Sequence, residues 1–496
     1  MALLAAAYGL AAALLALLGA HLIALGLIAH SRRSEDAACH ALPPRADALP
    51  PVLVQIPVYD EPLALVERVL EAAASLRART VRIQLLDDSA PAAAARNGAL
   101  VTALRNRGAD AHHLVRGTRE GFKAGALAAG LAADAAHPEG PAPFVALFDA
   151  DFVPAPDFLE RLLPPLLGDP SLAFAQARWT HRNAARGLCT RAQAALLDVH
   201  FAVEQHAREA AGLFVGFNGT AGVWRTHAIA EAGGWSGDTL AEDLDLSLRA
   251  RLRGLRGRYL NHVSVPAELP ETVRAWRRQQ FRWAKGALEV GRRLGRRLWT
   301  TPGLPLRVRL LTTLHLAAPL AWPALLALIV LHPVLAAGRA HGIPLGPAEP
   351  LGALGYVAGA AAVGTHLAAQ RRLGRSWLRA LHTLAPALLL PPGLALAGTR
   401  AALEALRGQR TPFVRTPKRA VAETGWLPGE AMLCGYALLG GALLLSLGAI
   451  GPALVQAFFA ASLGYAAWPP SPRPAGPPPV AARGGTCAAK PPSVLA

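Results

Sequence analysis

Hydrophobic and polar residues divide this chain into three unequal parts. Residues 3–29 are almost continuously apolar and carry no charged side chain, whereas most Asp and Glu residues lie between Ser31 and Arg309. Long apolar runs return from Leu310 onward. A helix needs about 20 apolar residues to cross the ~30 Å hydrocarbon core of a bilayer. The pattern therefore predicts a membrane protein that holds one soluble domain between its membrane-spanning helices.

The first apolar run, residues 1–30, is predicted to be a transmembrane helix. A cleaved signal peptide is the alternative, but no basic residues precede the run, and it exceeds the usual apolar stretch of about 7–15 residues. Arg32 and Arg33 follow it. Because basic residues favour the cytoplasmic side, we expect the N-terminus outside and the rest of the chain entering the cytosol. Pro43, Pro44, Pro50 and the following Pro51 mark residues 31–50 as a linker.

Residues 51–268 alternate between strand and helix patterns. The apolar runs Val52–Ile56, Val81–Leu86 and Phe144–Phe148 predict buried strands, and the segments between them predict helices. Such alternation is typical of an α/β domain with a mostly parallel sheet. Ligands of these sheets bind at the carboxyl ends of the strands, and acidic clusters follow the second and third of these runs.

Downstream of this domain the chain is expected to return to the membrane. Residues 269–300 predict basic, amphipathic interface helices, and residues 301–468 predict transmembrane or interfacial helices with a cytosolic loop near residues 399–425. The run 378–397 is interrupted by two prolines and flanked by Arg on both sides, which favours an interfacial or re-entrant segment. Residues 469–496 are rich in Pro, Gly and Ala and predict a disordered tail.

Charge distribution and cysteine spacing argue against a nucleic-acid-binding protein and against a protein built on disulfides or a cysteine metal site. The formal net charge is +17, but the Arg clusters lie at the ends of apolar runs, as the positive-inside rule requires, and form no single basic stripe that would bind nucleic acid. The four cysteines have neither metal-ligand spacing nor a disulfide pattern, and we interpret them as free thiols: Cys39, Cys189, Cys434 and Cys487.

Two acidic clusters at strand ends are candidates for binding a nucleotide and a metal ion. A carboxylate at Asp87 or Asp88 can accept hydrogen bonds from a base or a ribose, and the alternative is a turn-capping role. Asp149 and Asp151 suit a hard divalent cation that bridges phosphates, and the alternative is an acidic turn. Lys123 opens a predicted helix, where it can attract phosphate or be simply a solvated lysine.

A second group of candidates lies between residues 239 and 283. Glu242 and Asp243 precede a predicted helix, where a carboxylate can act as a general base or merely cap the helix. Gln279, Arg282 and Trp283 share one helical face. Arg can grip a phosphate and Trp can stack on a sugar, although a basic amphipathic helix also suits an anionic membrane surface.

Taken together, these motifs have an order that resembles the processive family 2 glycosyltransferases, which include cellulose, chitin and hyaluronan synthases. Within them the chain is most similar to the cellulose-synthase-like A group, the glucomannan 4-β-mannosyltransferases. The stretches 55–61, 217–225 and 232–235 carry this similarity together with GFKAGAL, the DxD pair and QxxRW. The resemblance extends from about Val52 to Lys418.

The resemblance implies a GT-A catalytic domain, a Rossmann-like α/β fold, inserted between transmembrane helices. Asp243 would be the catalytic base, with Glu242 beside it. Asp149 and Asp151 would hold Mg²⁺ or Mn²⁺ on the donor diphosphate. The residues implied to bind the nucleotide-sugar are Asp87, Asp88, Lys123, Asp149, Gln279 and Arg282.

The same resemblance assigns an acceptor site and a gating loop. The residues implied to face the polysaccharide acceptor are Phe217, Asn218, Gly219, Thr220 and Trp283. Phe413, Thr416 and Lys418 match the FxVTxK gating loop of cellulose synthases, although Arg415 stands where those enzymes have Val. Ala241 stands where cellulose synthases usually have Thr, but the carboxylate pair that follows is retained.

These implications predict an inverting, processive hexosyltransferase. It would extend a β-linked polysaccharide, β-1,4 in the first instance, from GDP-mannose and/or UDP-glucose and pass it across the membrane. One alternative is a non-processive family 2 transferase that loads a sugar onto a lipid carrier, and a second is a transporter or channel. The expected location is a bacterial inner membrane or its equivalent, with the catalytic domain cytosolic, membrane lipid as a partner, and accessory subunits unknown.

Overall fold

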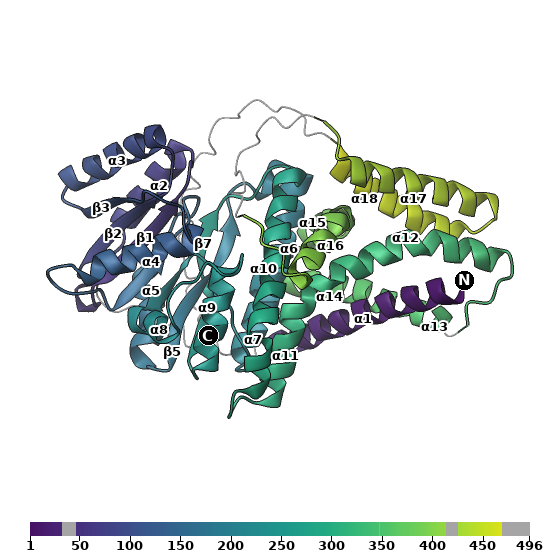
Figure 1. Cartoon of the computed structure of the whole chain (residues 1–496), viewed down its shortest axis with the longest axis horizontal. Coiled ribbons are helices and arrows are strands. Elements are labelled where there is room, and N and C mark those ends of the chain that lie inside the picture. Colours follow the sequence, from purple (N-terminus) through teal and green to yellow (C-terminus); the bar gives the residue numbers. More distant parts are fainter. Residues whose placement is uncertain (32–45, 347, 413–424, 469–496) are drawn as a thin grey trace, which may run out of the picture.

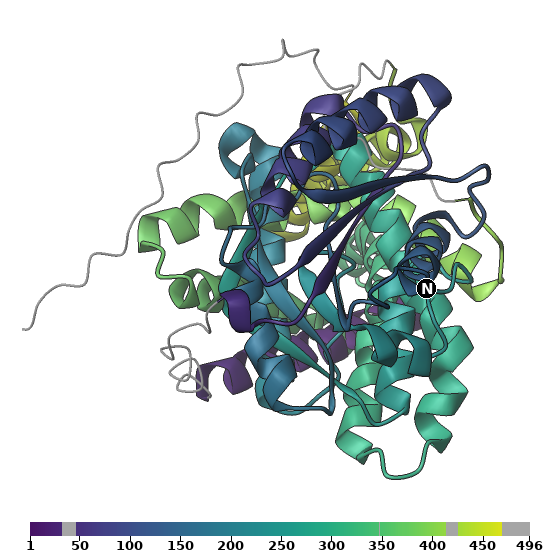
Figure 2. The ribbon, with the colours of Figure 1, turned by 90° about the vertical axis from the view of Figure 1, so that its left-hand side faces the viewer.

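The computed structural model describes residues 1–31, 46–346, 348–412 and 425–468. An α/β domain forms one end of the molecule and long helices form the other (Figure 1). Figure 2 looks along the long axis from the α/β end, so that the long helices lie behind the sheet. The chain thus folds as the hydropathy pattern predicts, with one polar domain between apolar helical segments.

Within the described residues, seven strands form one sheet in the order β3-β2-β1-β4-β6-β5-β7. All neighbours pair in parallel except β6, which runs antiparallel to β4 and β5. The strands are β1 (Val52–Val58), β2 (Val81–Asp87), β3 (Asp110–Val115), β4 (Phe144–Leu147), β5 (Leu172–His181), β6 (Gly222–Arg225) and β7 (Arg256–Ala267). The predicted mostly parallel α/β sheet is confirmed.

Helices cover both faces of this sheet because successive strand residues point to opposite sides. In β1, Val54 and Ile56 belong to one hydrophobic core, whereas Leu53 belongs to the other. The helices on the first face are α2 (Leu63–Ala74), α3 (Pro91–Asn106) and α5 (Phe158–Gly168). The helices on the second face are α4 (Phe122–Ala135), α8 (Thr226–Glu231) and α9 (Glu242–Leu252). The domain is therefore a three-layer α/β/α sandwich.

Two helical stretches connect the domain to the apolar helices. The first consists of α6 (Leu188–Val199), the π-helix η4 (His200–Gln205) and α7 (His206–Ala210). The second is α10 (Val273–Thr300), which follows β7 and packs against α16. Figure 1 shows α6 and α10 standing between the sheet and the apolar helices. Both stretches therefore link the α/β domain to the apolar helices.

Six apolar segments in the described part of the chain could cross a membrane, by length and composition. They consist of α1 (Ala2–Ser31), α11 (Leu306–Ala317) with η5 (Ala318–Leu320) and α12 (Ala321–Ala340), α13 (Ala348–Ala353) with α14 (Gly355–Arg372), α15 (Trp377–Leu389) with η6 (Pro391–Leu394) and α16 (Ala395–Leu406), α17 (Pro428–Ser446), and α18 (Ile450–Ala467). The protein is thus a multi-pass membrane protein.

Some predictions about organisation stay predictions. The segment expected to be interfacial folds as α15 and α16, broken at η6, and together the two helices also meet the criteria for a span. The predicted gating-loop residues Phe413, Thr416 and Lys418, most of the linker and the Pro-rich tail lie outside the described residues.

Candidate active site

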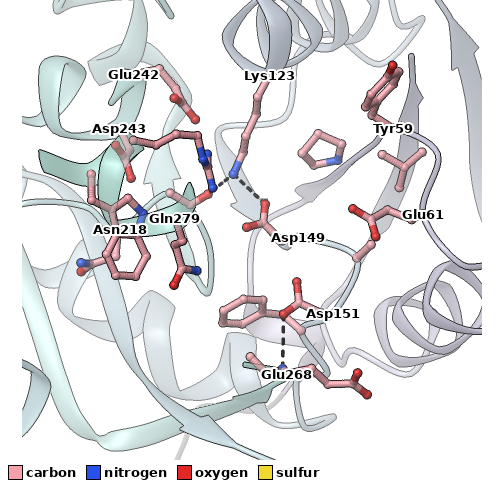
Figure 3. A pocket seen from close by; sticks show the side chains of 18 of the residues that line it. Tyr59, Glu61, Lys123, Asp149, Asp151, Asn218, Glu242, Asp243, Glu268 and Gln279 are labelled. Carbon is pink, nitrogen blue, oxygen red and sulfur yellow. Dashed lines mark hydrogen bonds and ion pairs between the residues drawn. The ribbon is translucent and has the colours of Figure 1, made fainter. Parts of the chain in front are cut away.

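A pocket with a volume of about 190 Å³ lies at the carboxyl ends of the parallel strands (Figure 3). Its walls come from the ends of β1, β2 and β4, the starts of α4 and α9, and the middle of α10. Eleven residues predicted from the sequence line it: Asp88, Lys123, Asp149, Asp151, Asn218, Gly219, Glu242, Asp243, Gln279, Arg282 and Trp283. The fold thus brings together side chains that are up to 195 positions apart, from Asp88 to Trp283.

Lys123 is placed at the centre of this pocket by the tight start of α4. Gly121 and Phe122 adopt φ angles of 67° and 48°, so the chain turns tightly where the helix begins. The Lys123 ammonium then donates to Asp149 Oδ1 at 2.6 Å and to the Gly219 carbonyl at 2.9 Å. Burial alone would lower the pKa of Lys123, but the surrounding carboxylates, chiefly Asp149, raise it above the ordinary value. The lysine therefore stays charged.

Gly219 allows the side chains of Asp243 and Lys123 to approach the same loop. Its φ angle is +80°, a conformation that L side chains rarely adopt. A Cβ at this position would lie 2.8 Å from Asp243 Oδ2 and 3.5 Å from Lys123 Nζ. Any larger residue would push one of these two groups away, so the loop needs glycine here.

Asp243 lies in the first turn of α9 with its carboxylate turned into the pocket (Figure 3). Burial and the neighbouring Glu242 raise the pKa of Asp243 to about 7, against the opposing influence of Lys123 and the Leu244 N–H, which donates to Oδ1 at 2.7 Å. A carboxylate with a pKa near neutrality is matched to accepting a proton at physiological pH. Asp243 is therefore the strongest candidate for a general base.

Asp149 and Asp151 flank the floor of the pocket after β4. Asp149 is held by Lys123, and its backbone N–H donates to Thr220 Oγ1 at 2.9 Å. Asp151 Oδ2 accepts from the Glu268 N–H at 3.2 Å. Among the described residues, no group of three or more His, Cys, Asp or Glu side chains is arranged to hold a metal ion. These two carboxylates can therefore supply only part of a metal coordination sphere.

Asp88 is positioned by a bidentate ion pair. Arg116 donates to its two oxygens at 2.7 and 2.5 Å, and the same guanidinium donates to the carbonyls of Glu120 and Phe122. The arginine thereby ties the end of β2 to the loop in front of α4. An ionised carboxylate has about four lone-pair positions, so Asp88 can still accept from a ligand in the pocket.

Three predicted residues lie behind the pocket wall instead of lining it. Asp87 is fully buried and accepts from Asn97, from the Ser89 N–H and from His113; burial raises its pKa, but these hydrogen bonds outweigh burial and bring it to about 2. Phe217 packs in the hydrophobic core, and Thr220 is fully buried beneath Asp149. All three side chains support the site from behind.

Four of the further residues that line the pocket are polar side chains that received no role from the sequence: Tyr59, Glu61, Arg119 and Glu268. The Arg119 guanidinium stacks over the Tyr59 ring, 3.4 Å from its centroid. Tyr59 and Glu61 follow the carboxyl end of β1, and Glu268 follows that of β7. For Tyr59, Glu61 and Glu268, the position after a strand end is the signal that could have identified them.

Two family models match this chain. The model described as glycosyl transferase family 2 matches residues 53–228, and the one described as glycosyl transferase family group 2 matches residues 144–340. Together they run from residue 53 to residue 340, which includes every lining residue of the pocket.

Plant proteins are among the curated relatives. The probable glucomannan 4-beta-mannosyltransferase 3 of Oryza sativa subsp. japonica is 42% identical over 261 residues, covering 52% of this chain and 47% of the relative. Glucomannan 4-beta-mannosyltransferase 2 of Arabidopsis thaliana is 43% identical over 249 residues, covering 49% of this chain and 46% of the relative. The chain thus spans about half the length of the curated relatives it matches.

The solved structures found by comparison include that of the mannosyltransferase PcManGT from Pyrobaculum calidifontis in complex with GDP-Man and Mn²⁺. It has a TM-score of 0.48 and 20% sequence identity, and the match covers 71% of this chain and 98% of that one. From the family models and the curated relatives, we conclude that residues 53–340 of this chain match glycosyltransferase family 2, and that about half of the chain resembles the glucomannan 4-beta-mannosyltransferases.

Proposed function

We propose that this protein is an inverting hexosyltransferase that extends a β-linked polysaccharide from a nucleotide-sugar. The observation that carries the proposal is one pocket in which a carboxylate with a pKa of about 7, Asp243, lies near a charged lysine, Lys123, and a half-buried arginine, Arg282. That combination offers a proton acceptor on one side and cations for a leaving diphosphate on the other.

The attacking group in this proposal is a hydroxyl of the acceptor sugar. Asp243 takes the hydroxyl proton while the oxygen attacks the anomeric carbon of the donor. The bond from that carbon to the diphosphate oxygen breaks, and its electron pair leaves with the nucleoside diphosphate. One displacement inverts the anomeric centre, so an α-linked donor yields a β-linkage without a covalent enzyme intermediate.

The charge of the pocket supports a role for a divalent cation. Among the described lining residues, seven are carboxylates and three are Lys or Arg: Glu61, Asp88, Asp149, Asp151, Glu242, Asp243 and Glu268 against Arg119, Lys123 and Arg282. A nucleoside diphosphate would be repelled by this excess. Magnesium is commonly bound by one or two protein carboxylates plus substrate phosphates, and Asp149 and Asp151 fit that pattern. When bound, Mg²⁺ or Mn²⁺ would neutralise the diphosphate.

The protein's own cations would share this task. Lys123 lies between Asp149 and Gly219, where it can also donate to a phosphate oxygen. Arg282 is half-buried in the pocket wall and interacts electrostatically with Glu242, Asp149 and Asp243. Burial strengthens such charge interactions because little water screens them. Gln279 and Trp283, from the same face of α10, would close the pocket over the sugars.

The nucleotide would occupy the part of the pocket near Asp88 and Tyr59. Asp88 can accept from a donor hydroxyl, and the Tyr59 ring, backed by Arg119, offers a stacking surface. Likeness to glucomannan mannosyltransferases favours GDP-mannose as the donor and a β-1,4 linkage, with UDP-glucose as the second donor to test. The neighbouring apolar helices suggest that the product leaves through the membrane, with the α/β domain in the cytosol.

Product analysis tests this proposal. Membranes containing the protein are incubated with radiolabelled GDP-mannose or UDP-glucose, with Mn²⁺ or with EDTA, and the products are separated by size and digested with β-specific glycosidases. The proposal predicts a polymer that depends on the metal and is cleaved by a β-mannanase or a β-glucanase. A chloroform-soluble product carrying one sugar would instead indicate a lipid-carrier transferase, and the absence of any product would contradict the proposed activity.

A further inference from the structure

The π-helix η4 places two polar side chains against the pocket residue Asn218. A π-helix is rare and is frequently found at functional sites, usually as one turn inside an α-helix. Here His200 begins the π-helical segment and Gln205 ends it. Gln205 Nε2 lies 2.8 Å from Asn218 Oδ1, and His200 Nε2 lies 3.0 Å from Asn218 Nδ2. Both ends of the Asn218 amide are therefore held by one helical segment.

The Gly216 carbonyl determines which groups donate and which accept in this series of hydrogen bonds. The Gly216 carbonyl can only accept, and Gln205 Nε2 donates to it at 2.9 Å. Gln205 consequently presents its NH₂ group to Asn218, whose Oδ1 accepts. The NH₂ group of Asn218 must then face His200 and donate to Nε2. His200 is thus required to be neutral, with its proton on Nδ1, which lies 4.0 Å from a Glu204 carboxylate oxygen.

The backbone of Asn218 is held independently of its side chain. Its N–H donates to Gln176 Oε1 at 3.0 Å, and Gln176 Nε2 donates to the Thr220 carbonyl at 3.0 Å. The preceding residue is held as well, since the Phe217 N–H donates to Ser247 Oγ at 2.9 Å. A change at His200 should therefore alter the orientation of the amide and leave the loop in place.

We propose that His200 and Gln205 are positioning residues that turn the Asn218 amide toward the acceptor sugar. This inference rests on the proposed glycosyl transfer. With one N–H donated to His200 and one lone pair used by Gln205, Asn218 keeps one N–H and one lone pair for the pocket, which it lines. This remaining N–H and lone pair match a sugar hydroxyl, which both donates and accepts. Freed from His200, the amide would rotate and lose this pairing.

The surroundings of His200 favour its neutral form. Burial lowers its pKa, Glu204 opposes this change and Arg208 adds to it. His315 on α11 also interacts with His200, and His21 on α1 lies 3.1 Å from Arg208. Since the contact needs a neutral ring, it holds above the lowered pKa and breaks as the pH falls through it. The acceptor KM should then rise at low pH.

Replacing His200 by Phe or by Gln tests the inference. His200→Phe keeps a ring but loses the acceptor atom, whereas His200→Gln keeps an oxygen that can accept from Asn218. With a short β-1,4-manno-oligosaccharide as acceptor, we expect His200→Phe to raise the acceptor KM about 5- to 10-fold, the effect of one net hydrogen bond, with donor affinity unchanged. His200→Gln should stay within about 2-fold of wild type and lose the rise in KM at low pH.

A double-mutant cycle separates positioning from general damage. In an Asn218→Ala background, His200→Phe should cause no further rise in acceptor KM, because the amide that it orients is gone. Gln205→Met provides a second variant with the same expectation if His200→Phe folds poorly. If wild type transfers sugar to the oligosaccharide, two results would overturn the inference. One is that the effects of His200→Phe and Asn218→Ala on the acceptor KM add in the double variant; the other is that donor affinity falls in parallel. Absence of transfer to the oligosaccharide in wild type would instead overturn the proposed function on which the inference rests.

Discussion

The charge of Glu242 should set the pH at which the proposed base becomes active. Burial and Glu242 raise the pKa of Asp243 to about 7, and Lys123 acts in the opposite direction. Protonated Asp243 cannot accept a proton from the acceptor hydroxyl. Activity should therefore fall as the pH drops through about 7, with kcat/KM reporting the free enzyme.

Replacing Glu242 by Gln removes the charge and keeps the shape of the side chain. If the carboxyl groups of Glu242 and Asp243 are taken to be about 6 Å apart, Coulomb's law at an effective dielectric constant of about 20 gives about 2.8 kcal/mol, or about 2 pKa units. Burial is the larger cause and remains in the variant. We therefore expect the acidic limb of kcat/KM to move down by about 1 to 2 pH units.

The assay is initial-rate transfer from the nucleotide-sugar between pH 5 and 9 at fixed ionic strength and saturating Mn²⁺. Glu242→Asp is the matched control, because it keeps the negative charge and should keep its acidic limb near that of wild type. A limb that stays near pH 7 in Glu242→Gln would refute the reasoning. The same holds for a limb that moves equally in both variants.

Three further perturbations test other parts of the site. Asp151→Asn should raise the Mn²⁺ concentration needed for half-maximal turnover by at least about 10-fold, since even second-shell changes weaken metal binding about 10–100-fold; an unchanged metal requirement would contradict the proposed role. Gly219→Ala should lower kcat by at least about 10-fold, because its Cβ would lie 2.8 Å from Asp243 Oδ2, whereas Gly108→Ala, at φ +90° with no atom near its Cβ, should leave kcat unchanged. Lys285 is fully buried, and its ammonium donates to Glu404 Oε2 at 3.1 Å and to the Gln409 carbonyl at 2.7 Å. Replacing it by Met breaks this ion pair and should cost about 3–5 kcal/mol of stability, measured as a lower thermal midpoint in detergent. Lys285→Arg should recover part of that loss, and equal midpoints for Met and wild type would argue against a structural role.

The sequence predicted the layout of the fold because hydrophobic periodicity and chain polarity are local signals. Alternating strands and helices required a mostly parallel sheet, and parallel strands place their carboxyl ends at one edge. Asp88, Asp149 and Asp151 follow from that rule alone. Asp243 and Arg282 do not: neither lies at a strand end, and only the resemblance to known transferases associated them with the same pocket.

Neighbouring residues with similar side chains were harder to separate. Asp87 and Asp88 are adjacent and chemically alike, but Asp87 is the last residue of β2 and turns into the protein, where Asn97 and His113 bind it. Which of two adjacent carboxylates faces a ligand depends on where the strand ends, and end positions are poorly defined by sequence patterns. Long-range contacts decide the outcome.

The contacts of Asn218 were beyond prediction for another reason. A π-helix has no sequence periodicity that distinguishes it from the surrounding α-helix, and η4 interrupts what reads as one continuous helix. Its His200 and Gln205 meet Asn218 only because α6, η4 and α7 pack beside the loop that precedes β6. Such contacts become visible only once the tertiary structure is known.

In the proposed reaction Asp243 accepts the proton, in a pocket where other groups bind the donor. Asp243→Asn keeps the size of the side chain and removes its basicity, so it should bind the nucleoside diphosphate with Mn²⁺ about as tightly as wild type. Its transfer rate should fall by at least about 100-fold, within the range attributed to a general base. Isothermal titration of the donor nucleotide and single-turnover transfer, measured on the same purified sample, compare the two directly. Near-normal transfer with normal binding would contradict the account.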